Sequence, residues 1–205
     1  FIVKITDAPL SISPASANVP PRGSRVFAGS GGEGSYTYAI AANASGATID
    51  AAGNYTAGPT GGVVDQVEVT DSAGAKATAN VNVGPGVSIT PASIPTTPPR
   101  GAPIQLAASG GSGTGFVWTM AAAPSGGTVS ATGVYTPGPN AGPATDKVRV
   151  TDSLGNQAEV AIPIGLGVAI TPASPSVPPR GEITFDATGG SNAGYTWSSV
   201  SLASG

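Results

Sequence analysis

The residues able to do chemistry are few, and the clearest are two pairs of aspartates. The 205-residue chain has no histidine and no cysteine, so it has no imidazole base, Ser-His-Asp triad, thiolate, disulfide or cysteine metal site. The pairs are Asp65 with Asp71 and Asp146 with Asp152. Six residues of strand span about 20 Å, whereas one calcium ion needs oxygens at about 2.3–2.6 Å. We therefore expect Asp71 and Asp152 to hydrogen-bond their own turns, with calcium binding as the alternative.

The lysines offer no better catalytic candidate. Lys4, Lys76 and Lys147 each lie on or near an alternating strand pattern, which indicates an exposed face. No motif supports a Ser-Lys dyad. We therefore predict no catalytic residue, no cofactor-binding residue and no metal ligand, and a protein that is not an enzyme.

Two phrases recur about every 80 residues. The tetrapeptide Pro-Pro-Arg-Gly places its arginine at Arg22, Arg100 and Arg180. A second phrase precedes it each time, at 10–16, 87–93 and 168–174. A solenoid unit runs about 20–50 residues, so this period suits a small domain instead. The arginines are interpreted as structural groups that satisfy loop carbonyls at the domain junctions, or alternatively as exposed contacts for a partner.

Composition excludes several classes of function. Only 9% of the residues are charged, against about 25% in typical proteins, and the net charge is −3. No basic stripe is available for phosphates, so we expect no nucleic-acid binding. No run of 18 apolar residues is present, so we expect no membrane insertion. The Ser/Thr/Ala/Gly-rich, weakly charged surface favours a secreted protein at the cell surface or outside the cell.

Hydrophobic alternation predicts strands and gives no helical period. In the stretch 87–167 we expect about seven short strands, separated by glycine and proline turns. Its first strand should be an edge strand, broken or switched between sheets, because Pro91 and the Pro98-Pro99 pair cannot donate to a ladder. Seven antiparallel strands with one aromatic-rich strand predict an all-β, two-sheet sandwich. The expected core anchors are Trp118 on the third strand and its equivalents in the other repeats, Tyr36, Tyr38, Tyr195 and Trp197.

Four segments of the sequence resemble bacterial immunoglobulin-like repeats. They are Gly53–Thr56, Asp65–Asp71, Gly133–Thr136 and Asp146–Asn156. Such repeats occur in large exported surface proteins, adhesins and appendages. The resemblance covers nearly the whole chain and implies tandem immunoglobulin-like β-sandwiches that are extracellular and not enzymatic, while sandwich folds host many roles.

The repeats predict four segments. They are an orphan strand at 1–8, complete repeats at 9–86 and 87–167, and an incomplete third repeat at 168–205. The orphan phrase Val3-Lys-Ile-Thr-Asp7 is similar to 67–71 and 148–152. One hypothesis makes it a donor strand that completes the third repeat of a neighbouring copy, head to tail. The alternative is that the sequence, which begins at Phe1, belongs to a longer chain that completes this repeat.

The predicted function is a non-catalytic structural subunit of an extracellular fibre, filament or surface stalk. Its partners would be copies of itself or neighbouring domains of a longer chain, without cofactors. The alternative is an adhesin, or a module that binds a receptor or a cell-surface glycan or protein. The sequons Asn43-Ala-Ser45 and Asn54-Tyr-Thr56 can accept N-glycans in a suitable host.

Overall fold

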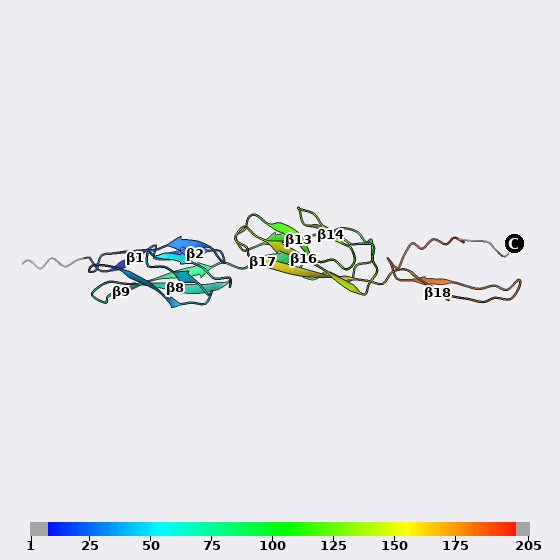
Figure 1. Ribbon diagram of the computed structural model, residues 1–205, viewed down its shortest axis with the longest axis horizontal. Helices are drawn as coiled ribbons and strands as arrows, with labels where there is room; N and C mark the ends of the chain where they lie inside the picture. Colours follow the sequence, from blue (N-terminus) through cyan, green and yellow to red (C-terminus); the bar gives the residue numbers. More distant parts are fainter. Residues whose placement is uncertain (1–7, 200–205) are drawn as a thin grey trace, which may run out of the picture. The chain divides into compact units, whose positions relative to one another are not determined.

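Strands and loops make up the described part of the chain. The computed structural model describes residues 8–199, and no helix occurs in that range (Figure 1). These residues accordingly contain no helix that is long and apolar enough to cross a bilayer. By packing, the chain forms two compact units, built mainly of residues 8–89 and of residues 90–199. The fold is all-β and immunoglobulin-like.

The first repeat contains nine strands. They are β1 (Ser11–Ser13), β2 (Ser16–Val19), β3 (Ser24–Val26), β4 (Ala28–Ser30), β5 (Thr37–Ala42), β6 (Thr48–Ile49), β7 (Asn54–Thr56), β8 (Val63–Thr70) and β9 (Lys76–Val83). One sheet has the order β2-β9-β8-β5, and the facing strands form the groups β1-β4 and β3-β7-β6. All pairings described here are antiparallel except β2 with β9, which is parallel.

The core of this repeat lies between the two sets of strands. Alternate residues of β8 and β9 are buried, including Val67, Val69 and Val81. Ile12 and Phe27 come from the facing strands and belong to the same apolar cluster. Burying one apolar side chain of this size stabilises the folded state by about 1.5–3 kcal/mol relative to leaving it exposed. The apolar residues that alternate along each strand therefore point to the same side and form one apolar layer between the sheets.

The second repeat contains eight strands. They are β10 (Ser88–Thr90), β11 (Ile104–Gln105), β12 (Ala107–Ser109), β13 (Val117–Ala122), β14 (Thr128–Val129), β15 (Val134–Thr136), β16 (Ala144–Thr151) and β17 (Gln157–Ile164). They form the groups β10-β12, β11-β15-β14 and β13-β16-β17. β16 and β17 are neighbours in their sheet and are consecutive along the chain, so they form a hairpin.

The first strand of each complete repeat changes sheets, as the prolines predict. β10 ends before Pro91, and the chain resumes pairing at Thr97, which forms a parallel bridge to Ile164. In the first repeat β1 pairs with β4, and β2 then pairs with β9. Because proline has no N–H, it falls where the chain leaves one ladder for the other.

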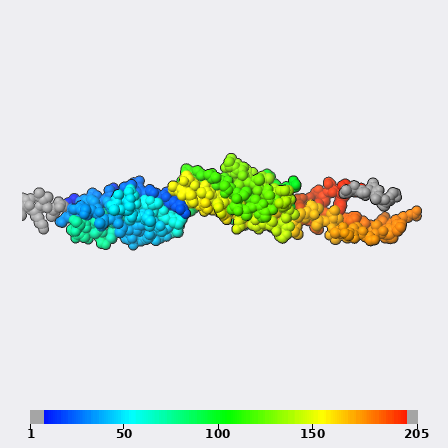
Figure 2. All heavy atoms as spheres, in the orientation of Figure 1, coloured from blue at the N-terminus to red at the C-terminus, as the bar shows by residue number. Residues whose placement is uncertain are grey.

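The described part of the third repeat forms one small two-stranded sheet, and several of its apolar side chains are exposed. β18 (Ala169–Thr171) pairs with β19 (Asp186–Thr188). Ile170 is 49% exposed, whereas its equivalents Ile12 and Ile89 are 8% and 6% exposed. Phe185 is 40% exposed, although the same position in the complete repeats is fully buried. In Figure 2 an opening lies between the orange and red parts of this segment.

The expected aromatic anchors are only partly right. Trp118, Tyr36 and Tyr38 are half-buried, and Trp197 is exposed. The fully buried aromatic side chains are instead Phe27, Tyr55 and Tyr135. The strand that carries Trp118 is β13, at one edge of its sheet. One side of an edge strand has no neighbouring strand to cover its side chains, which leaves a large indole partly open.

Candidate functional site

A fully buried carboxylate is the most unusual group of the first repeat. Asp65 lies on β8, and its Oδ1 accepts hydrogen bonds from the backbone N–H groups of Ala44 (2.7 Å) and Ser45 (2.8 Å). Its Oδ2 accepts from the Ser45 hydroxyl and the Tyr55 hydroxyl, each at 2.5 Å. We call Ser45, Tyr55 and Asp65 the buried triad. It connects the loop before β6, strand β7 and strand β8.

The second repeat builds the same triad from Ser125, Tyr135 and Asp146. The Ser125 hydroxyl and the Tyr135 hydroxyl donate to Asp146 Oδ2 at 2.6 and 2.7 Å. The Ser125 N–H donates to Oδ1 at 3.0 Å. All three side chains are fully buried. Two copies of one geometry in two separate cores show that it belongs to the repeat.

The charge of Asp65 is maintained by hydrogen bonds alone. Burial opposes this charge, but the donors of Ser45 and Tyr55 and the two backbone amides outweigh it, so the pKa of Asp65 lies below its ordinary value. Burial, followed by the bond to Asp65, raises the pKa of Tyr55. Among residues 8–199 the ion pairs are Lys76–Glu68 and Arg149–Glu159, both on the surface. Asp65 therefore takes part in no ion pair with these described residues.

The buried triad stabilises the fold and has no access to a substrate. A serine beside a carboxylate resembles part of a catalytic site, but Ser45 Oγ is already engaged, since it also accepts from the Gly58 N–H at 3.0 Å. The side chains of both triads are closed to solvent. A nucleophile must reach its substrate within hydrogen-bonding distance, which these positions prevent.

The neighbouring glycine is required by this close approach. A Cβ on Gly58 would lie 1.9 Å from the Ser45 carbonyl oxygen, and one on Gly138 would lie 2.0 Å from that of Ser125. Both glycines donate their N–H to the triad serine, at 3.0 and 3.1 Å. The chain must therefore lack a side chain here for the triad to close.

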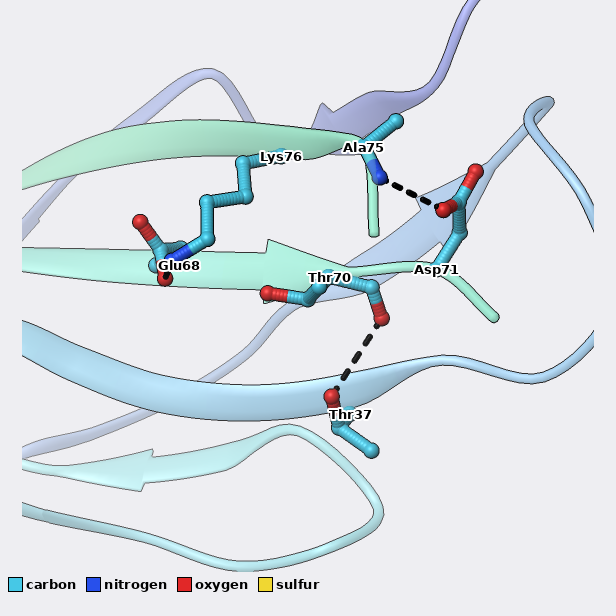
Figure 3. Close-up of polar contacts among 6 residues, drawn as sticks. All are labelled: Thr37, Glu68, Thr70, Asp71, Ala75 and Lys76. Atoms are coloured by element: carbon cyan, nitrogen blue, oxygen red, sulfur yellow. Dashed lines mark hydrogen bonds and ion pairs between the residues drawn. The ribbon is translucent and has the colours of Figure 1, made fainter. Parts of the chain in front are cut away.

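The second aspartate of the first pair lies in a turn, as expected. Asp71 Oδ1 accepts from the N–H groups of Ala73 (3.0 Å) and Ala75 (2.8 Å), in the turn between β8 and β9 (Figure 3). Its Oδ2 accepts from the Glu33 N–H at 2.9 Å. The Glu33 bond, followed by the turn amides, lowers the pKa of Asp71. Asp71 thus joins its own turn to the loop after β4.

Asp152 repeats this arrangement in the second repeat. Its Oδ1 accepts from the Leu154 and Asn156 N–H groups at 2.9 and 2.8 Å, and its Oδ2 from the Ser112 N–H at 2.6 Å. The Asn156 side chain also donates to Oδ2. Burial opposes the charge, yet these bonds lower the pKa to about 2. Among residues 8–199 no three acidic side chains gather as metal ligands would.

The three repeated arginines occupy identical turns. Gly23, Gly101 and Gly181 each donate their N–H to the proline carbonyl three residues earlier, at 2.9, 3.0 and 2.9 Å. The arginine before each glycine has a φ of 62°, 55° or 64°. Proline followed by a positive φ is the pattern of a type II turn. The three arginine side chains are exposed, and bonds from their guanidinium groups to loop carbonyls at the domain junctions stay a prediction.

The backbone of this turn connects to the triad in both complete repeats. The Arg22 N–H donates to the Gly58 carbonyl at 3.0 Å, and the Arg100 N–H donates to the Gly138 carbonyl at 2.9 Å. These are the two glycines that bind the triad serines. The sequence therefore repeats Pro-Pro-Arg-Gly for the backbone geometry, while the arginine side chains stay exposed.

The remaining candidates have ordinary surroundings. Lys76 is exposed and pairs with Glu68 at 2.7 Å across the β8–β9 hairpin (Figure 3). Lys4 lies outside the described residues, and Lys147 is exposed. Both sequon asparagines already use their amide nitrogens, Asn43 to Ala47 O and Asn54 to Asp50 Oδ2. A glycan on either would have to replace that bond.

Sequence reasoning missed the buried triad, although a signal was present. Ser45, Tyr55 and Asp65 follow one another at intervals of ten residues, and Ser125, Tyr135 and Asp146 do so almost identically. A polar residue that recurs in register inside an apolar pattern is either exposed or satisfied in the core. The alternation along β8 and β16 places both aspartates on the buried face.

Comparisons with known proteins give similarity of fold only. No protein-family model matches the chain, and no curated protein matches it. Solved structures with similar parts include an intimin mutant of EHEC O157:H7, at 21% identity over 41% of this chain and 50% of that chain, with a TM-score of 0.32. A C-terminal intimin fragment bound to the intimin-binding domain of its translocated receptor gives 16% identity over 82% and 68%, with a TM-score of 0.39.

A third structure is Drosophila N-cadherin EC1-3, at 16% identity over 79% of this chain and 68% of that chain, with a TM-score of 0.34. The chain thus spans between half and about two thirds of these three chains. Similarity at this level assigns no activity, ligand or partner to the chain.

Proposed function

We propose that this protein is a non-catalytic structural subunit of an extracellular fibre, filament or surface stalk built from immunoglobulin-like repeats. The observation that carries the proposal is the buried triad, formed twice with the same partners and closed to solvent both times. The serine, tyrosine and aspartate of each triad, which resemble parts of a catalytic site, instead form hydrogen bonds that stabilise the repeat. The linkers at 84–86 and 165–167 are short, which suits load-bearing between successive domains.

Location and partners follow from the surface. The chain is weakly charged and slightly acidic, with a pI near 4.7, which disfavours nucleic acid as a partner. Its stability does not depend on disulfides, since it has no cysteine. We place it outside the cell or on the cell surface, and the resemblance of its repeats to exported bacterial proteins supports that location. Its partners are copies of itself or neighbouring domains of the same kind.

Association by strand addition is part of this proposal. The third repeat exposes Ile170 and Phe185 at positions that the complete repeats bury. Exposed apolar side chains beside unpaired backbone favour capture of another strand. The orphan strand at 1–8 lies almost entirely outside the described residues and is the candidate donor.

The second candidate is an adhesin that binds a glycan or protein. Trp197 favours it, because this tryptophan is 54% exposed and its ring lies 6.3 Å from that of Phe185. Exposed aromatic pairs are common in binding surfaces. The same pair also occupies core positions of the repeat, so we rank the structural role first.

Electron microscopy of native surface material, labelled with antibodies against the chain, tests the structural role. Regular fibres or stalks that carry the label are the expected result. Unconnected particles, together with specific signal on a glycan array, would replace the structural role with the adhesin.

A further inference from the structure

We infer that strand β13 of the second repeat pairs with β13 of a second copy, antiparallel and with Thr119 on the two-fold axis, so that two chains associate side by side. This inference goes beyond the proposed function, because the structural role requires neither this strand nor this register. It concerns the second repeat alone.

β13 lies at an open edge of its sheet. The order of strands in that sheet is β13-β16-β17, so β13 has one neighbouring strand within the described residues. Its six residues, Val117 to Ala122, include no charged residue and no proline. Charged side chains and proline are common means by which proteins block a long edge strand against further pairing. The composition of β13 therefore favours the addition of another strand.

The other edges of the second repeat are protected or short. β17, at the opposite edge of the same sheet, contains Glu159 and Pro163. Thr97 also covers the end of β17 through its bridge to Ile164. The remaining edge strands, β10, β11, β12 and β14, have two or three residues each. Very short edge strands offer little backbone for pairing. Within this repeat, β13 is thus the edge best suited to accept a strand.

The backbone of β16 shows which of its residues face β13. The Asp152 N–H donates to Asn156 O at 3.0 Å, on the side of β17. The Ser153 N–H donates to Thr114 O at 3.1 Å, on the side of β13. Backbone groups alternate in direction along a strand, so Thr151 and the other odd-numbered residues of β16 face β13.

The first repeat gives the residue of β13 that lies opposite Thr151. Thr37 lies opposite Thr70 in the equivalent pair of strands (Figure 3), and these residues correspond to Val117 and Thr151. The backbone groups of Val117 therefore face β16. Those of Trp118, and of every second residue after it, point to the open edge.

A pair centred on Thr119 makes these free groups meet. Trp118 of each chain then lies opposite Met120 of the other, and each such pair exchanges two backbone hydrogen bonds. Both side chains are only half-buried in the single chain. The contact would cover them, and a thioether beside an indole ring is a favourable neighbour.

The length of the strand favours this centre over its neighbours. A centre at Thr119 pairs residues that all belong to β13. A centre at Trp118 would require Phe116, which precedes the strand, and a centre at Met120 would leave Val117 unpaired. Centres between residues would oppose inward-facing to outward-facing backbone groups, so no ladder would form.

The outer face of the strand supports the same contact. Val117 is 60% exposed and would lie opposite Ala121 of the second copy. The two Thr119 side chains would meet at the axis. β5 of the first repeat has the same length, but Thr37 stands where β13 has Val117. The second repeat therefore gains more from covering this edge.

The contact is small, which sets its strength. About five paired residues of each strand span about 17 Å. Stable interfaces bury about 1,200–2,000 Å², more than one strand edge provides. The pair should therefore dissociate on dilution and become stronger where many copies are held side by side, as in a fibre.

Disulfide trapping tests the register, because the chain has no cysteine of its own. Thr119→Cys should give a covalent two-chain product under mild oxidation at millimolar concentration. The two Cα atoms at this position would lie about 4.5 Å apart, which a disulfide can span. Val117→Cys alone should give little, because its two copies would lie about 14 Å apart. A mixture of Val117→Cys with Ala121→Cys should again give the product.

The pattern among these variants decides the result. Trapping of Thr119→Cys and of the mixture, without trapping of Val117→Cys, supports the register. Equal trapping of Thr119→Cys and Val117→Cys, or no trapping of Thr119→Cys, would overturn it. All three positions are exposed, and circular dichroism of each variant checks that the strands are retained.

Light scattering of the unmodified chain gives an independent measurement. At millimolar concentration it should show a two-chain species that disappears on dilution. Thr119→Lys should raise the dissociation constant at least about tenfold, because two like charges would lie opposite each other. The matched control is Thr136→Lys on β15 of the facing sheet, which should leave the constant unchanged. A monomer at all concentrations, or an equal effect of both lysines, contradicts the pair.

The pair and the structural role fail in different ways. Labelled fibres in native material, together with a chain that gives no trapping, would reject the pair and leave the structural role. Specific trapping, together with native material that has no fibre or stalk, would support the pair and reject the structural role.

Discussion

The second and third repeats begin with nearly the same sequence, but their equivalent apolar side chains are buried to very different extents. Both contain the Ile-Thr-Pro-Ala-Ser phrase, the Pro-Pro-Arg-Gly turn and an aromatic strand. Ile89 and Leu106 are buried in the second repeat, whereas Ile170 and Phe185 are open in the third. The difference shows that the early strands form only half of the core. The later strands β15, β16 and β17 close the second repeat.

The comparison also separates local from cooperative structure. The arginine turn and the glycine loop have the same geometry in all three repeats, with or without a core. The buried triad requires a loop and two later strands to meet. The triad is therefore a property of the complete sandwich, whereas the turns are set by their own residues.

Replacing the equivalent phenylalanine by alanine in the first and in the third repeat should give the largest difference in the free energy of unfolding. Phe27→Ala removes a fully buried ring from the first repeat and should cost about 3–5 kcal/mol. Phe185→Ala occupies the equivalent position in the third repeat and should cost less than about 1 kcal/mol in monomeric chains, because that ring is already half open. Hydrogen exchange resolved to single peptides measures both. Equal costs would show that the third repeat has a closed core in solution.

Asp146→Asn should give the next largest effect. The amide cannot accept the Ser125 and Tyr135 hydroxyl bonds as the carboxylate does, and a loss of about 2 kcal/mol is expected for the second repeat. Urea unfolding followed by Trp118 fluorescence measures the loss. The matched control is Asp186→Asn, an exposed aspartate of β19, which should change the free energy of unfolding by less than about 0.5 kcal/mol. An equal, small effect of both would mean that the triad does not stabilise the fold.

The Asp152 carboxylate should make the free energy of unfolding depend on pH. The pKa of Asp152 is about 2 in the folded chain, below its usual 3.8, so the unfolded chain takes up this proton first as the pH falls. The stability that Asp152 provides is then complete above about pH 4 and is lost toward pH 2. The difference in unfolding free energy between the natural chain and Asp152→Asn should narrow across this window. A difference that stays constant from pH 5 to pH 2 would contradict the hydrogen-bonded turn.

Sequence patterns predicted what depends on neighbours along the chain and missed what depends on distant strands. Hydrophobic alternation within 87–167 predicted strands such as β16, and Pro91 marked a point where the first strand of the repeat is interrupted. Asp152 was placed correctly because the two turn N–H groups that donate to its Oδ1 lie within four residues. Asp146 was not, since its partner Ser125 lies 21 residues away. The contrast between buried Phe27 and half-open Trp118 likewise depends on which strands cover each ring.

The arginine turn should show the smallest effect, and the effect should be equal in all repeats. Arg100 has a φ of 55°, which costs an ordinary residue about 1 kcal/mol and glycine almost nothing. Glycine also gains freedom in the unfolded chain, worth about 0.4–1 kcal/mol in the opposite direction. The two contributions nearly cancel, so Arg100→Gly should leave the unfolding free energy within about 1 kcal/mol.

Its neighbour gives the matched comparison. A Cβ on Gly101 would lie 2.9 Å from the Pro98 carbonyl oxygen, so Gly101→Ala should destabilise the repeat more than Arg100→Gly does. Urea unfolding of the two variants, followed by Trp118 fluorescence, decides this order. A large loss from Arg100→Gly would mean that the exposed guanidinium group has a contact outside its own turn. The repeated motif would then be maintained for its arginine side chain as well as for its backbone.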